Sequence, residues 1–243
     1  MNGLRSDDRG LSELIGYVLA FSIVIASVSV VYTGGLGAVM EYQEDERERN
    51  AERAFVALAE SLNDLQRGDA PARNGEIRLA QGRLSMQDGP TVSVVVNDSG
   101  GSVEVFERRV GALSYAVGNT RVAYITGGVL RENSDAGSIA AMPPFRCTDQ
   151  SAVVSLVTLS ARDASTLSGQ GSVLIEAEKR STRVLYPSES NPDPSSVTIS
   201  FDENSAAWSR ELVEAGWTQS GDELTCETDR VVVRRTAVSI DFL

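Results

Sequence analysis

The sequence predicts an α+β fold, in which a long N-terminal membrane and stalk helix is followed by an antiparallel β-sandwich-like domain. Two observations support this prediction. An uncharged stretch runs from Leu14 to Met40, and short β-branched segments separated by polar turns fill the chain after Asn74. We therefore divide the 243-residue chain into a leader (1–10), a transmembrane helix (11–40), an amphipathic stalk helix (41–67) and a β-rich domain (75–243).

The uncharged stretch is long enough to cross a membrane. It contains 27 residues between Glu13 and Glu41, which corresponds to about 40 Å of α-helix. A bilayer core requires only about 20 residues. A secretory signal peptide would have a shorter apolar core followed by a small-residue cleavage site, so we expect a single-pass membrane protein.

The junction between the leader and the helix reads Asp8-Arg9-Gly10-Leu11-Ser12-Glu13-Leu14-Ile15-Gly16. It resembles the N-terminus of archaeal type IV pilins and pilin-like proteins, particularly those of haloarchaea. In that family a prepilin peptidase cuts on the cytoplasmic side, after a small residue that follows a charged one. The resemblance therefore implies a cut between Gly10 and Leu11. Many members have proline at the position of Glu13.

The resemblance also implies a topology and partners. The N-terminus would lie in the cytoplasm and the β-rich domain outside the cell. The partners would be the membrane, the prepilin peptidase, and further copies or other pilin-like subunits in a surface filament.

Glu13 has two interpretations. Ser12 is a good N-cap, and a carboxylate in the first turn complements the helix dipole. Alternatively, by resemblance to bacterial type IV pilins, Glu13 pairs with the new α-amine of a neighbouring subunit.

Small residues form one stripe on the transmembrane helix, at steps of four, three and four: Ser22, Ala26, Ser29 and Thr33. Small side chains let two helix backbones approach closely in lipid, so we expect helix packing there. The alternative is that a lone membrane helix tolerates small residues at these positions.

The chain between the membrane segment and Gly68 is also helical in pattern. Three glycines, Gly34, Gly35 and Gly37, predict a kink or local melting at the outer end of the span. Beyond them, apolar residues recur at helical spacing and form one face: Ala51, Phe55, Leu58, Leu62 and Leu65. We expect this face to pack along neighbouring subunits and, beyond Phe55, against its own β-domain.

The β-rich region shows short apolar runs separated by turn residues. Residues 91–96 and 102–106 predict one hairpin, and 121–125 with 129–131 predict another. One helix is expected at 205–217, where Trp208, Leu212 and Val213 share a face, and a polar loop at 187–196. Further strands are expected at 76–79, 152–159, 172–178, 182–186, 197–201, 223–226, 231–233 and 238–242.

The charge composition is strongly acidic. The formal net charge is −12, from 34 acidic and 22 basic residues, and Lys179 is the only lysine. Such a surface stays hydrated at high salt, which favours a halophilic protein, and it disfavours nucleic acid as a partner. The alternative is that a GC-rich genome exchanged lysine for arginine.

Two cysteines and one asparagine are candidate modification sites. Cys147 and Cys226 could form a disulfide outside the cell, worth about 4 kcal/mol on the chain-entropy model, or remain buried free thiols. Asn97-Asp98-Ser99 matches the N-glycosylation pattern on an expected turn, although such triplets also arise by chance.

The residue types offer little catalytic chemistry. The sequence contains no histidine, which excludes Ser-His-Asp and Cys-His arrangements, and it has no phosphate-binding loop. We expect no enzyme, no cofactor and no metal site. The favoured function is a pilin-like cell-surface structural protein, as a filament subunit or minor pilin. The alternative is a permanently anchored single-pass protein that displays a β-sandwich binding domain outside the cell.

Overall fold

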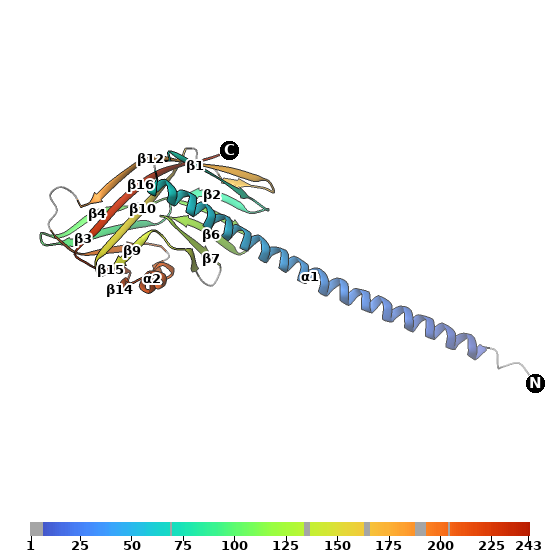
Figure 1. Ribbon diagram of the computed structural model, residues 1–243. Coiled ribbons are helices and arrows are strands. Elements are labelled where there is room, and N and C mark those ends of the chain that lie inside the picture. The colour runs from blue at the N-terminus through green and yellow to red at the C-terminus, as the bar shows by residue number, and fades with distance from the viewer. Residues whose placement is uncertain (1–6, 69, 134–136, 163–165, 188–192, 204) are drawn as a thin grey trace, which may run out of the picture. The chain divides into compact units, whose positions relative to one another are not determined.

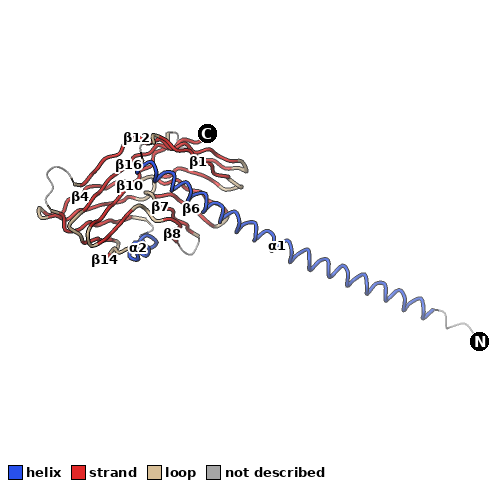
Figure 2. The backbone as a smooth tube through the Cα atoms, viewed as in Figure 1, coloured by secondary structure: helices blue, strands red, loops and turns tan. Residues whose placement is uncertain are grey.

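The computed structural model describes residues 7–68, 70–133, 137–162, 166–187, 193–203 and 205–243 (Figure 1). Side chains are described from Glu13 onward, apart from those of 35–41 and 205. The α+β fold is confirmed: an apolar helix near the N-terminus is followed by a β-rich region (Figure 2). Contacts divide the chain into two compact units, Met1–Glu46 and Arg47–Leu243, so the second unit includes helical residues well before the expected domain start at 75.

The first helix, α1 (Asp7–Arg67), is longer and less interrupted than the sequence predicts. It begins before Ser12, so the expected N-cap at Ser12 is wrong for the uncut chain. It also continues through Gly34, Gly35 and Gly37, so the expected local melting is wrong. Glycine lowers helix propensity but retains its backbone N–H, so it weakens the helical hydrogen-bond ladder without breaking it.

The helix ends where the sequence predicts. The Gly68 amide donates to the Asp64 carbonyl at 2.9 Å, and Pro71 follows shortly. The predicted apolar face is confirmed as a core face of the second unit, because Ala51, Phe55, Leu58, Leu62 and Leu65 are all buried. Packing of this face along neighbouring subunits stays a prediction.

The strands form three sheets. Sheet A has the order β1 (Ala72–Arg78), β12 (Ser172–Tyr186), β16 (Val231–Phe242), β10 (Ser151–Ala161), β9 (Phe145–Thr148). Sheet B has the order β11 (Thr166–Ser168), β2 (Arg83–Gln87), β5 (Ala112–Val117), β6 (Thr120–Ile125), β7 (Gly128–Glu132), β8 (Gly137–Ala141). Sheet C has the order β14 (Thr218–Ser220), β15 (Glu223–Glu227), β13 (Pro194–Phe201), β3 (Thr91–Asp98), β4 (Gly101–Arg109).

One strand pair departs from the predicted antiparallel arrangement. β10 and β16 run parallel, in register from Ala152 opposite Val231 to Ala161 opposite Ile240. Parallel neighbours need a crossover connection. The chain between these strands supplies it, and forms β11, β12, the three strands of sheet C after β4, and the second helix. The expectation of a wholly antiparallel domain is therefore wrong at the centre of sheet A.

The short helix α2 (Ser205–Glu214) ends earlier than predicted. Trp208 and Leu212 are fully buried, as expected for one face, but Val213 is 43% exposed and does not share it. The chain turns at Gly216, whose φ is +96°, and the Trp217 amide returns to the Leu212 carbonyl at 3.0 Å.

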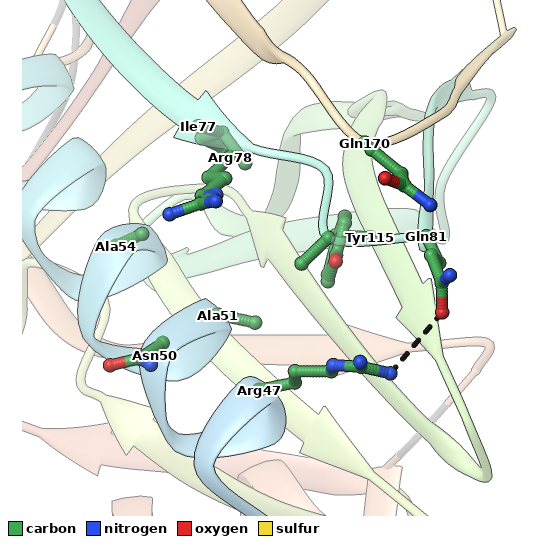
Figure 3. Close-up of a pocket in the computed structure, with 10 residues that line it drawn as sticks. Arg47, Asn50, Ala51, Ala54, Ile77, Arg78, Gln81, Tyr115 and Gln170 are labelled. Atoms are coloured by element: carbon green, nitrogen blue, oxygen red, sulfur yellow. Dashed lines mark hydrogen bonds between the residues drawn. The ribbon is translucent and has the colours of Figure 1, made fainter. Parts of the chain in front are cut away.

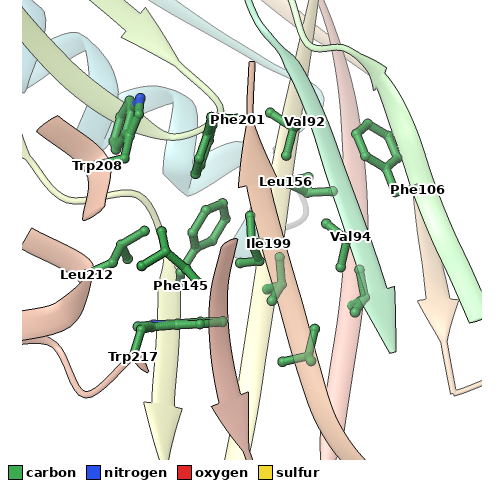
Figure 4. Packing of buried hydrophobic residues seen from close by; sticks show 14 of the residues in the cluster. Val92, Val94, Phe106, Phe145, Leu156, Ile199, Phe201, Trp208, Leu212 and Trp217 are labelled. Carbon is green, nitrogen blue, oxygen red and sulfur yellow. The ribbon is translucent and has the colours of Figure 1, made fainter. Parts of the chain in front are cut away.

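Two hydrophobic cores share sheet A. The first packs sheet A against sheet C and α2, with Phe201 stacked on Trp208 at a ring-centroid distance of 5.4 Å (Figure 4). The second packs the 51–65 face of α1 and sheet B against sheet A. β10 supplies Ala152, Val154 and Leu156 to the first core and Val157 and Leu159 to the second. Side chains alternate across a strand, so β10 is covered on both faces.

Candidate functional site

The exposed apolar part of α1 is the principal candidate site. Among the described residues, Glu13–Gly34 is the one helical segment long and apolar enough to cross a membrane, with 22 residues and a mean hydropathy of 2.5. At 1.5 Å per residue it spans about 33 Å, which matches a hydrocarbon core of about 30 Å. None of it is buried within the protein. A helix that is apolar all round and uncovered fits a membrane or a protein partner, and not water.

The hydroxyl groups of this segment are satisfied within the helix. Ser22 Oγ donates to the Val18 carbonyl at 2.7 Å, Ser29 Oγ to the Ile25 carbonyl at 2.8 Å, and Thr33 Oγ1 to the Ser29 carbonyl at 2.8 Å. Ser27 Oγ bonds in the same way to the Ile23 carbonyl. These bonds lower the cost of placing the hydroxyls in apolar surroundings. The small-residue stripe therefore offers close approach of backbones more than hydrogen bonds to a partner.

The helix geometry brings the stripe residues together. At 100° per residue, Ser22, Ala26, Ser29 and Thr33 lie within an arc of about 60° on one face, and all four are exposed. The same geometry places Glu13 about 180° from Ser22. Glu13 is exposed on the face opposite the stripe, so any contact that it makes with a neighbouring subunit is separate from packing of the stripe. The role of Glu13 in helix packing stays a prediction.

The expected processing site lies at the edge of the described chain. Gly10 and Leu11 belong to the first turns of α1, and their side chains lie outside the described residues. The leader positions 1–6 also lie outside them.

The second unit contains a polar pocket of about 360 Å³ (Figure 3). Arg47 and Asn50 of α1 form one side, and the turn after β1 forms the other, where Arg47 Nη1 donates to Gln81 Oε1 at 3.3 Å. Ala80 and Gln81 have φ values of 44° and 72°, so this turn holds two non-glycine residues in the left-handed region. Tyr115 reaches under the turn and donates its hydroxyl to the Leu79 carbonyl.

Tyr115 is the one candidate acid–base group in the described lining of this pocket. That lining contains no aspartate or glutamate. Burial raises the pKa of Tyr115, and the Gly82 backbone hydrogen bond and the Arg47 charge oppose that rise without cancelling it. The phenol therefore stays protonated at neutral pH and holds the turn in place, which is a structural role.

The two cysteines form a disulfide. Cys147 of β9 and Cys226 of β15 have Cα atoms 5.7 Å apart, and the bond links sheet A to sheet C beside the first core. Of the two alternatives open from the sequence, the structure therefore contains the disulfide.

Asn97 lies in β3 and not on the expected turn. Its Nδ2 donates to Ser196 Oγ at 2.9 Å, and its Oδ1 accepts from Ser102 Oγ at 2.5 Å. Both ends of the amide thus serve cross-strand contacts in sheet C, so its geometry adds no support for glycosylation.

A partly buried ion cluster between α1 and sheet B was not predicted from the sequence. Arg131 of β7 donates through Nη2 to Glu48 at 2.9 Å and through Nη1 to Glu52 at 3.2 Å, which ties two successive turns of α1 to sheet B. The i, i+4 spacing of the two glutamates was the available signal, because it places like charges side by side on one helix face.

Comparison with known proteins gives one family. No curated protein and no solved structure matches this chain. Residues 9–241 match a family of unknown function, DUF7289, and this range includes both the apolar helix and the β-rich unit. The chain belongs to the DUF7289 family.

Proposed function

We propose that this protein is a pilin-like structural subunit of the cell surface, held in the membrane by Glu13–Gly34 and assembled through the small-residue stripe of that segment. The observation that carries the proposal is an apolar, uncovered helix of 22 residues that presents Ser22, Ala26, Ser29 and Thr33 on one face. A lone anchor needs apolar residues but no such face. The resemblance of the junction around Gly10 to a prepilin supports the same function, and this proposal includes an extracellular β-rich unit.

The test is a pair of identical substitutions on different faces of the helix. Ala26→Leu enlarges the stripe, whereas Ala20→Leu makes the same change about 150° from the centre of the stripe. Both raise the apolar character of the span, so both should insert normally. In a packed assembly only Ala26→Leu should force helices apart, and we expect it to reduce recovery of sheared filaments or cross-linked oligomers by about tenfold.

Recovery is measured at matched membrane abundance of the two variants. Equal recovery of both variants and the parent would favour the second candidate function, a permanently anchored single-pass protein that displays its β-rich unit. That alternative draws on the same exposed helix, which is a sufficient anchor by itself.

Leader removal gives a second, independent test. N-terminal sequencing of the native protein should find Leu11 as its first residue. Gly10→Leu should block the cut, because the peptidase must accommodate the residue before the scissile bond. A native chain that still begins at Met1 would contradict the prepilin-type maturation.

A further inference from the structure

A second cavity in the β-rich unit, of about 440 Å³, is lined by three arginines. It lies between the last turns of α1, the segment that enters β9, and the strands β10 and β16 of sheet A. Its volume falls within the range of about 300–1,000 Å³ that small-molecule sites occupy. Its described lining belongs to the second unit, so the cavity has no part in the proposed assembly through the stripe.

The three arginines come from elements that are far apart in the sequence. Arg67 belongs to the last turn of α1, Arg146 to β9 and Arg234 to β16. The described lining of the cavity contains no aspartate or glutamate. In a chain of net charge −12, three guanidinium groups that share one cavity form a local site for an anion.

Ion pairs within the protein do not account for these arginines. Arg67 has a contact of 3.6 Å with Asp64, but the two side chains are 65% and 54% exposed, and such a surface pair contributes little to stability. Neither Arg146 nor Arg234 has a carboxylate partner among the described residues. Their charges are therefore available to a ligand.

Capping of α1 does not account for them either. The Gly68 amide donates to the Asp64 carbonyl at 2.9 Å, and Lys179 Nζ donates to the Gly68 carbonyl at 2.8 Å. A positive charge at a helix C-terminus is stabilising, and Lys179 supplies one without Arg146 or Arg234.

The free donors of the arginines favour a tetrahedral anion over a carboxylate. Arg234 is oriented by its Nε, which donates to Ser155 Oγ at 2.7 Å, and Ser155 is only 1% exposed. Both Nη atoms of Arg234 and the whole guanidinium of Arg146 have no hydrogen-bond partner among the described residues. A carboxylate has two oxygens and fills one guanidinium fork, whereas phosphate or sulfate has four oxygens and can accept from several guanidinium groups at once.

We propose that the cavity binds a doubly charged tetrahedral oxyanion, either as free phosphate or sulfate or as the terminal monoester group of a small molecule. Its oxygens accept hydrogen bonds from the Nη atoms of Arg146 and Arg234, and Arg67 contributes a third positive charge. This binding site goes beyond the proposed function and does not rest on it.

The test follows phosphate binding to the full chain, in a detergent that carries no phosphate, by phosphorus NMR at constant ionic strength in slightly alkaline buffer. We expect saturable binding of inorganic phosphate, displacement by sulfate, and no displacement by acetate or chloride at the same concentration. Glycerol 3-phosphate separates the two sources of the anion. A site for a monoester should bind it more tightly than inorganic phosphate, whereas a site for the free ion should not.

Three variants locate the site. Arg146→Gln should weaken phosphate binding about tenfold, because it removes charge-assisted hydrogen bonds. Arg146→Lys keeps the charge but loses the planar fork, so it should restore only part of the affinity. Arg108→Gln is the matched control, since Arg108 is an exposed arginine of β4 outside the cavity, and it should bind like the parent. Arg146 is exposed, so its replacement should leave the thermal unfolding midpoint without phosphate unchanged.

The outcomes separate clearly. Displacement of phosphate by acetate as readily as by sulfate would overturn the assignment to a tetrahedral anion. Absence of phosphate binding, or equal binding by the Arg146→Gln and Arg108→Gln variants, would overturn the site. Equal binding by Arg146→Lys and the parent would overturn the contact through the guanidinium fork. None of these results depends on whether the protein forms filaments.

Discussion

Tyr124 of β6 shows how a single buried group links stability to pH. Its ring lies in the second core, and its hydroxyl has no partner among the described residues. Burial raises the pKa of this phenol far above its ordinary value of 10.0. An unfolded chain would release the proton near pH 10, whereas the folded chain retains it. The folded state therefore binds more protons in alkaline solution, and the free energy of unfolding falls as pH rises above that point.

Tyr124→Phe should remove this dependence. At neutral pH we expect the free energy of unfolding to stay equal or rise by about 1 kcal/mol, since the change deletes a polar atom that lacks a partner. Above pH 10 the slope against pH should become shallower by up to about 1.4 kcal/mol per pH unit. Urea unfolding of the detergent-solubilised chain at a series of pH values measures both effects.

Tyr115→Phe is the contrasting variant. Burial also raises the pKa of Tyr115, but its hydroxyl donates to the Leu79 carbonyl, so its loss should cost about 1 kcal/mol at neutral pH. If both variants were equally destabilised at neutral pH, Tyr124 would have an unrecognised partner.

At the scale of elements, Arg131 fastens α1 to sheet B. Its two glutamate contacts, at 2.9 and 3.2 Å, are partly shielded, because the side chains of Arg131 and Glu48 are 32% and 15% exposed. Arg131→Gln should lower the free energy of unfolding by about 2 kcal/mol, since it removes charge-assisted bonds and leaves Glu48 beside Glu52. The measurement is urea unfolding followed by far-UV circular dichroism.

The control is Arg109→Gln. Arg109 pairs with Asp88 at 3.3 Å, but the two side chains are 63% and 83% exposed. Its loss should cost no more than about 0.5 kcal/mol. Equal effects of the two substitutions would mean that the Arg131 contacts are as weak as an ordinary surface pair.

Some of the strands could be predicted from sequence patterns, and others could not. The β3–β4 and β6–β7 hairpins were predictable because β-branched runs flank short turns, and both are confirmed. β5 was missed because five of its six residues are buried, so polar and apolar residues do not alternate along it. β12 and β16 were each predicted as two strands, because a polar stretch divides them. In the structure both stretches continue the strands: Lys179 lies opposite Val238, and Arg235 lies opposite Arg183, with a register shift between Lys179 and Ser181.

Across the whole molecule, the disulfide makes the clearest stability prediction. Cys147 and Cys226 are 79 residues apart, and closing a loop of that length restricts the unfolded chain. Replacing both with alanine should lower the free energy of unfolding by about 4 kcal/mol on the chain-entropy model. Mass analysis of alkylated protein, with and without reductant, establishes the bond. Urea unfolding of parent and variant then gives its contribution, and a difference near zero would contradict the entropic account.

The candidate sites differ in how far the sequence could predict them. The stripe from Ser22 to Thr33 follows from helix periodicity alone, because its residues are neighbours on one helix. A surface cavity lined by Arg67, Arg146 and Arg234 could not be predicted in this way, because these residues meet only through the parallel pairing of β10 with β16 and the packing of α1 on sheet A. No local pattern specifies those long-range contacts.

The parallel pair also constrains how the protein can be made. β16 is the final strand, yet it lies between β12 and β10, and even Leu243 exchanges backbone hydrogen bonds with Leu174. A ribosome releases the apolar helix long before it releases β16, the middle strand of sheet A. Sheet A therefore has a gap at its centre until β16 has been made and has reached the compartment where the unit folds. A chain that terminates before Val231 would keep its apolar segment but would present β10 and β12 with open edges, a ready target for proteases and for aggregation.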